Sequence, residues 1–181
     1  MRPMGPASEI ATTSTRLRGA IPGLVGSWVK AFTEPRLQVV AESAWPPSAA
    51  QKLEVGADPR GHPQNMPPAV IVGRLASAFG HRTLTDDERV RAQRVIHYGF
   101  GCGLGVAYSA VAKRWRPASR GGGAAAGLAI YAGTHGIVLP AAGVQRPPWR
   151  LPWAAVAWEA ASHVAFGAAL ESARRALEAI E

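Results

Sequence analysis

Formal charge is scarce in this chain and missing from long parts of it. Charged residues make up 18% of the 181 residues, which is low for a soluble domain, whereas hydrophobic residues make up 48%. Residues 95–112 and 121–144 contain no Asp, Glu, Lys or Arg, and residues 151–170 contain Glu159 alone. A helix needs about 20 largely apolar residues to cross the roughly 30 Å hydrocarbon core of a bilayer. The distribution of charge therefore predicts membrane-spanning helices.

Several chemical motifs are also missing from the sequence. Cys102 is the only cysteine, so no intrachain disulfide can form. There is no phosphate-binding glycine loop, nucleophile elbow or metalloprotease motif. The apolar stretch at residues 20–29 contains Pro22 and is followed by Lys30, which does not fit a cleaved signal peptide. We therefore expect a protein that is not an enzyme and that carries no cofactor.

The formal net charge of +8 raises the question of nucleic-acid binding. The cations, however, stand at the ends of the apolar stretches, at residues 113–120 and at Arg174 and Arg175. Membrane proteins mark their cytoplasmic loops in this way, so both termini are expected on the cytoplasmic side. The expected partner is the lipid bilayer and not nucleic acid. A soluble helical enzyme or nucleic-acid binder is the hypothesis that this distribution disfavours.

The sequence predicts an all-α, polytopic membrane bundle with four hydrophobic segments. We expect a disordered tail at residues 1–16, followed by a single membrane domain at residues 17–181. The four hydrophobic segments are predicted at residues 18–36, 90–114, 122–143 and 152–174. The long loop outside the membrane is predicted at residues 41–89.

The first hydrophobic segment is the weakest, because Arg18 and Lys30 frame only a short apolar stretch. It either crosses the membrane with Lys30 extended towards the headgroups, re-enters from one side, or lies in the interface. Within the long loop, residues 67–80 have apolar residues at helical spacing and predict an amphipathic surface helix. The run Thr85-Asp86-Asp87-Glu88 predicts a capping box that begins a long helix.

The most unusual stretch is VAWEAASHVAF, residues 156–166, which places Glu159 and His163 one helical turn apart in apolar surroundings. A carboxylate at bilayer depth opposes insertion by roughly 3 kcal/mol or more, so it needs a partner. With a rise of about 1.5 Å per residue, His135 and Glu159 come to the same depth on neighbouring antiparallel helices. The same half of the bilayer would hold His97 and Glu34. We predict an intramembrane polar layer of these five side chains.

Three roles are open for this layer. The groups can pair with one another and hold the bundle together, as interhelical polar contacts commonly do. They can form a proton or ion pathway, since intramembrane ionisable groups are functional by default. They can bind a metal, although no compact ligand spacing is present, and we expect none.

Small residues recur at helix-packing spacing in two of the spans. Gly101 and Gly105 lie in the second segment, and Gly123 and Gly127 lie in the third. Such spacing lets helix backbones approach closely. It is compatible with tight packing inside the chain, with a homo-oligomer and with a larger membrane complex.

Several runs of the sequence are distinctive: His97-Tyr98, the segment from Gly101 to Tyr108, THGIVLPAAG at 134–143, EAASHVAFG at 159–167 and GLVGSWVKAFTEPR at 23–36, with Pro46-Pro47 after it. Together they resemble the YagU family of bacterial inner-membrane proteins. The resemblance implies an integral, multi-pass protein of the bacterial inner membrane with a suggested connection to acid tolerance.

The sequence therefore supports two hypotheses about function. In the first, the protein responds to protons or ions through its buried histidine and glutamate layer, since histidine titrates near pH 6.5. In the second, it is a non-catalytic structural or assembly subunit of a membrane complex. A water-accessible Glu159 would favour the first hypothesis, and a sealed and paired Glu159 would favour the second.

Overall fold

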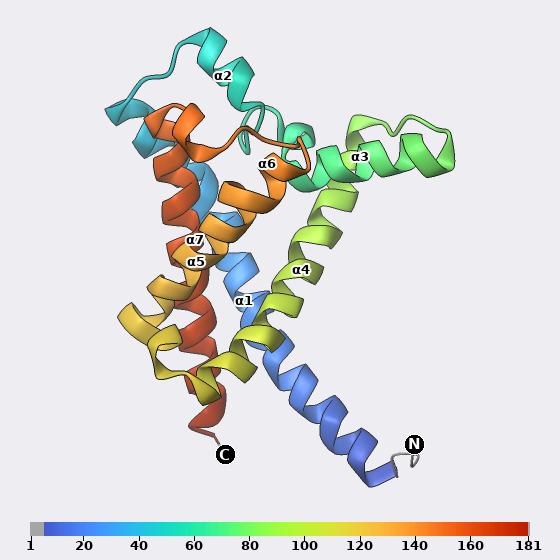
Figure 1. Ribbon diagram of the computed structural model, residues 1–181, viewed down its shortest axis with the longest axis vertical. Helices are drawn as coiled ribbons and strands as arrows, with labels where there is room; N and C mark the ends of the chain where they lie inside the picture. Colours follow the sequence, from blue (N-terminus) through green and yellow to red (C-terminus); the bar gives the residue numbers. More distant parts are fainter. Residues whose placement is uncertain (1–5, 181) are drawn as a thin grey trace.

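The computed structural model describes residues 6–180, with side chains from residue 18 onward, and this part of the chain is all-α without strands. Four helices form the body of the molecule (Figure 1). They are α1 (Pro6–Ala44), α4 (Asp86–Arg114), α5 (Ala124–Gly133) and α7 (Trp153–Glu178). Helix α1 packs against both α4 and α7, and α5 packs on the other side of α7. From the turn η2 (Arg116–Gly123), α4 and α5 diverge (Figure 1).

Two helical stretches among the described residues are long and apolar enough to cross a membrane. They are Asp86–Arg114 and Arg116–Ala141. The prediction of four spans is not supported by this criterion, because α1 and α7 do not meet it. The reason is that both carry ionisable residues in mid-helix, such as Lys30 and Glu34 in α1 and Glu159 in α7, which lower their hydropathy.

Helix α1 is longer than the first hydrophobic segment. The tail predicted to be disordered covers residues 1–16; residues 1–5 lie outside the described part, and residues 6–16 are helical. No Gly or Pro interrupts residues 7–18, so a helix formed downstream can extend through them at little cost. The helix continues through Pro22 and Pro35, so a re-entrant loop in this segment is wrong.

The third hydrophobic segment stays helical through Ala141, but its winding changes before Pro140. Helix α5 ends at Gly133, a π-helical turn covers Thr134–Val138, and the short α6 covers Leu139–Ala141. Pro140 has no backbone N–H and its ring conflicts with the carbonyl four residues earlier. A widened turn relieves this conflict, and such turns often occur at functional sites. His135 lies within it.

The loop at residues 41–89 contains helices of its own. These are α2 (Ala49–Val55), η1 (Pro63–Asn65) and α3 (Pro67–Gly80). The last residues of α1 and the first residues of α4 also fall within this range. The predicted capping box is present: Thr85 Oγ1 accepts from Glu88 N at 3.3 Å, and Glu88 Oε2 accepts from Thr85 N at 2.9 Å. Helix α3 has the predicted bounds and runs sideways from the top of α4 (Figure 1).

Two small apolar clusters flank a polar middle of the bundle. One contains Ala41, Ala154 and Trp158. The other contains Tyr108, Ala118, Phe166 and Leu170. Along α7, the buried Glu159, Ser162 and His163 lie between them. The candidate site is therefore enclosed by packed side chains above and below.

Candidate functional site

Glu159 is the centre of the site and its side chain is almost fully buried, at 1% exposure. Gln145 Nε2 donates to Glu159 Oε1 at 2.8 Å. His135 Nδ1 lies 3.1 Å from Glu159 Oε2 but forms its hydrogen bond, at 2.7 Å, with Gln145 Oε1. As a result, Glu159 Oε2 has no hydrogen-bond partner among the described residues. The carboxylate is thus half-satisfied, with an imidazole within reach of its free oxygen.

The hydrogen bonds of this network determine which side chains act as donors and which as acceptors. An ionised carboxylate can only accept, so Gln145 presents its NH₂ group to Glu159 and its carbonyl to His135. His135 therefore carries a proton on Nδ1.

Aromatic and imidazole rings close the site on one side. The ring of Tyr131 stacks on His135 with centroids 5.3 Å apart, and the ring of His163 meets His135 edge-on at 5.0 Å. His163 Nδ1 donates to the main-chain oxygen of Glu159 at 2.8 Å. The hydroxyl of Tyr131 is buried without a partner in the described part of the chain. His163 is therefore not the partner of the Glu159 carboxylate that the sequence suggested, because its ring bonds the preceding turn of its own helix.

A second polar cluster lies next to the first, on α1. Lys30 and Glu34 form a buried ion pair one helical turn apart. Ser162 Oγ lies 3.4 Å from Glu34 Oε1 and donates to the Glu159 carbonyl at 2.8 Å, which links the clusters through α7. Lys30 is 9% exposed, so its side chain does not extend away from the bundle as it would in one of the three predicted arrangements of this segment. Pairing with Glu34 provides the partner that makes this burial possible.

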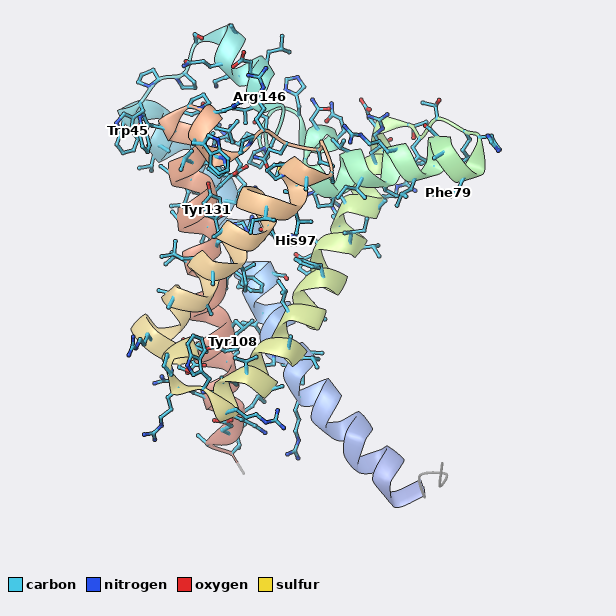
Figure 2. The ribbon with its side chains drawn as sticks, viewed as in Figure 1. Trp45, Phe79, His97, Tyr108, Tyr131 and Arg146 are labelled. Carbon is cyan, nitrogen blue, oxygen red and sulfur yellow. The ribbon has the colours of Figure 1, made fainter. Side chains whose placement is uncertain are left out.

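His97 belongs to the second cluster and not to the first. Its Nε2 bonds the main-chain oxygen of Ser27 at 3.0 Å, between α4 and α1 (Figure 2). The predicted layer of Glu34, His97, His135, Glu159 and His163 is thus divided into two linked parts. His135, Glu159 and His163 lie together, and Glu34 and His97 lie on the α1 side.

Sequence reasoning missed several polar residues. Gln145 lies in the linker after α6, where one polar side chain carries no signal by itself. Tyr108 and Glu171 form a separate buried network with Arg174 and Arg175, near the lower ends of α4 and α7 in Figure 2. Tyr108 Oη donates to Glu171 Oε2 at 2.8 Å. Arginines in the last turn of α7 were attributed to the membrane surface alone, yet they also satisfy a buried glutamate.

The four predicted packing glycines all lie at helix contacts within the chain. Gly101 and Gly105 pack on α1, where an added Cβ would lie 1.7 Å from Ser27 Oγ and 2.4 Å from the Gly19 carbonyl oxygen. Gly123 and Gly127 pack on α7. These glycines therefore hold the helices of one chain together.

Among the described residues, no group of three or more His, Cys, Asp or Glu side chains is placed to hold a metal ion. The glutamine between His135 and Glu159 is a hydrogen-bond relay.

The family model described as "Protein of unknown function (DUF1440)" matches residues 38–172. The chain belongs to this family. The matched DUF1440 region includes Gln145, His135, Glu159 and His163, whereas Lys30 and Glu34 precede it. No curated protein and no solved structure matches the chain. The resemblance to the YagU family is not confirmed by this match and stays a prediction.

Proposed function

We propose that this DUF1440 protein is an integral, multi-pass protein of the bacterial inner membrane in which α1 and α7 cross the bilayer together with the two apolar stretches. In α1, polar side chains are buried in the bundle and large apolar side chains are exposed, which supports its place in the bilayer. Ser27 and Gln38 are 0% and 4% exposed, whereas Trp28 and Phe32 are 60% and 52% exposed. Water would favour the opposite arrangement, and lipid favours this one.

The positions of the cations support one orientation. One end of the bundle carries Arg146 and Arg150 in its short linker and Arg89, Arg91 and Arg94 in α4, whereas residues 113–120 and the last turns of α7 place six basic residues at the opposite end. The positive-inside rule places that end in the cytoplasm. The Glu159 site, in the other half of α7, then lies towards the periplasm, where external acid would reach it first.

Membrane integration is tested by alkaline carbonate extraction of membranes that contain the full chain. The expected result is that the protein stays in the pellet and dissolves only in detergent. Release of the intact chain into the soluble fraction contradicts the membrane proposal.

We further propose that the protein is proton-responsive, with a link to acid tolerance, and that His135 and Glu159 are the responding pair. The burial of Glu159, which is 1% exposed, favours the structural hypothesis, whereas the unbonded Glu159 Oε2 at 3.1 Å from His135 Nδ1 supports the proton-linked one. Protonation of His135 would create a positive charge beside the buried carboxylate, and the attraction is strong where water is excluded. The relay through Gln145 would then be free to rearrange, because Glu159 could accept from His135 directly.

The test compares Glu159→Gln and His135→Ala with the wild type in bacteria that produce the chain. Internal pH after acid challenge is followed at matched amounts of folded membrane protein. The change in internal pH after acid challenge should differ from that of the wild type by the same amount in both variants. Tyr108→Phe is the control, because it removes a buried hydroxyl from the separate Glu171 network and preserves shape.

Wild-type behaviour of both variants would refute the proton-linked role. A second candidate function is then favoured, that of a structural or assembly subunit, in which these groups hold the helices together. The exposed apolar side chains of α4 and of the π-helical turn after α5, such as Val95, Phe100 and Ile137, supply a surface for lipid or for partner helices. This second candidate predicts loss of folded protein from the same variants, with no specific change in internal pH in what remains.

A further inference from the structure

Helix α3 is held at a fixed angle to α4 and forms an elbow with it (Figure 1). Arg74 Nη1 and Nη2 donate to the carbonyls of Ala142 and Gly143, at 3.1 and 2.9 Å. On the other flank, Arg82 Nη2 donates to Glu88 Oε1 at 2.9 Å. Arg74 therefore ties α3 to the turn after α6, and Arg82 ties the loop after α3 to the first turn of α4.

The inner corner of this elbow is an open, apolar pocket of about 610 Å³. Val72, Leu75 and Phe79 line it from α3, at the spacing of a single helix face. Leu75 is 50% exposed and Phe79 is 81% exposed. Figure 2 shows Phe79 on the underside of α3, the side towards which α4 descends. An apolar helix face turned in this direction fits the acyl region of a lipid layer.

The rim of the pocket carries an uncompensated positive charge. Arg82 and Glu88 line it and neutralise each other at 2.9 Å. Arg91 also lines it, is exposed, and makes no hydrogen bond or ion pair within the described part of the chain. One helical turn further along α4, Val95 is 73% exposed and begins the uncharged part of the helix. The pocket thus combines a free guanidinium with apolar walls on two sides.

We propose that this pocket binds one anionic phospholipid, with its phosphate on Arg91 and its acyl chains against α3 and along Val95. The proposal rests on the membrane location proposed above. A guanidinium is a strong partner for a phosphate oxygen. Zwitterionic lipid would fit the apolar walls equally well, so the net charge at the rim is what selects an anionic headgroup.

The experiment is native mass spectrometry of the full chain, solubilised from bilayers of phosphatidylglycerol and phosphatidylcholine. The wild type should keep one phosphatidylglycerol in preference to phosphatidylcholine. Arg91→Gln should weaken retention roughly five-fold, from about 1 kcal/mol per basic residue at a membrane surface. Phe79→Ser should weaken retention of both lipids, because it removes part of the apolar wall.

Arg94→Gln is the matched control, since Arg94 is exposed on the same helix, loses the same charge and does not line the pocket. It should retain the lipid as the wild type does. Equal losses from Arg91→Gln and Arg94→Gln would overturn the site, because they would indicate general surface attraction. Full displacement by free glycerol phosphate would also overturn it, because the apolar walls would then contribute nothing.

The failure of this proposal is distinguishable from failure of the membrane location. Carbonate extraction of each variant is measured on the same membranes. A chain that stays in the pellet but keeps no phosphatidylglycerol overturns the lipid site and leaves the membrane proposal standing. A chain released into the soluble fraction overturns both.

Discussion

Gly127 of α5 packs directly on the main-chain carbonyl of His163 in α7. A Cβ added at Gly127 would lie 2.1 Å from that carbonyl oxygen. The close approach of the two backbones holds the ring of His163 against those of His135 and Tyr131, with centroids 5.0 and 5.5 Å away. Helix packing and the geometry of the polar site are therefore coupled through one glycine.

Gly127→Ala should destabilise the folded protein, by about 1–3 kcal/mol, because the new methyl group must push α5 and α7 apart. Gly133→Ala is the control, since an added Cβ there meets nothing within 4 Å. Thermal unfolding in detergent should show a lower midpoint for Gly127→Ala and little change for Gly133→Ala. Equal midpoints for the two variants would show that this helix contact is not tight.

The buried pair of Lys30 and Glu34 predicts an asymmetric effect of mutation. Lys30→Met leaves Glu34 buried without its ion-pair partner, and such losses cost about 3–5 kcal/mol. The double variant Lys30→Met/Glu34→Leu should recover most of this loss. Removal of Lys52 from its exposed pair with Glu42 should cost under about 1 kcal/mol. The measurement is the free energy of unfolding, and a double variant no better than Lys30→Met would argue against this account.

Glu159 and His135 should be energetically coupled, whereas Glu159 and His97 should not. The first pair lies 3.1 Å apart, and His97 bonds Ser27 in the other cluster. A double-mutant cycle with Glu159→Gln and His135→Ala should give a coupling energy of at least about 0.5 kcal/mol. The cycle with His97→Ala should be additive within about that value. Equal coupling in both cycles would mean that the polar layer acts as one unit.

Thr85 should control the stability of the first turn of α4. Thr85→Ala removes the acceptor for Glu88 N and should cost about 1 kcal/mol. Hydrogen exchange should become faster at residues 86–89 and stay unchanged in the middle of α4. Thr83→Ala is the control, because Thr83 precedes the cap and is exposed. Identical exchange in the two variants would remove the role of the capping box.

The local stability of the turn around Asp58 should depend on pH. Burial alone would raise the pKa of Asp58, but hydrogen bonds from Gly61 N, Gln38 and Arg60 N outweigh it and lower the pKa below 3.8. The stabilisation is therefore present above pH 3.8 and is lost as the pH falls through the lower folded-state pKa. Amide protection at Gly61 should fall in that range, and Asp58→Asn should lower it already at neutral pH. Glu54→Gln should leave protection unchanged, and a pH-independent profile in the wild type would contradict the assignment.

The sequence by itself determined the helical class, the two uncharged stretches, the start of α4 and the bounds of α3. These features depend on local composition, on the capping box and on helical periodicity, which are present in neighbouring residues. The sequence also predicted that His135 and Glu159 lie at the same depth, because the rise per residue of a helix is constant.

Only the tertiary structure decided which side chains meet. Gln145 enters the site because Pro140 and the π-helical turn redirect the chain after α5. Lys30 is buried because a glutamate one turn away neutralises it, whereas the sequence left the placement of its segment open. The rotation of each helix about its axis depends on contacts between distant residues, so His97 could be assigned a depth from the sequence but not a partner. Close packing at glycines such as Gly127 sets these rotations, and it is a property of two helices together.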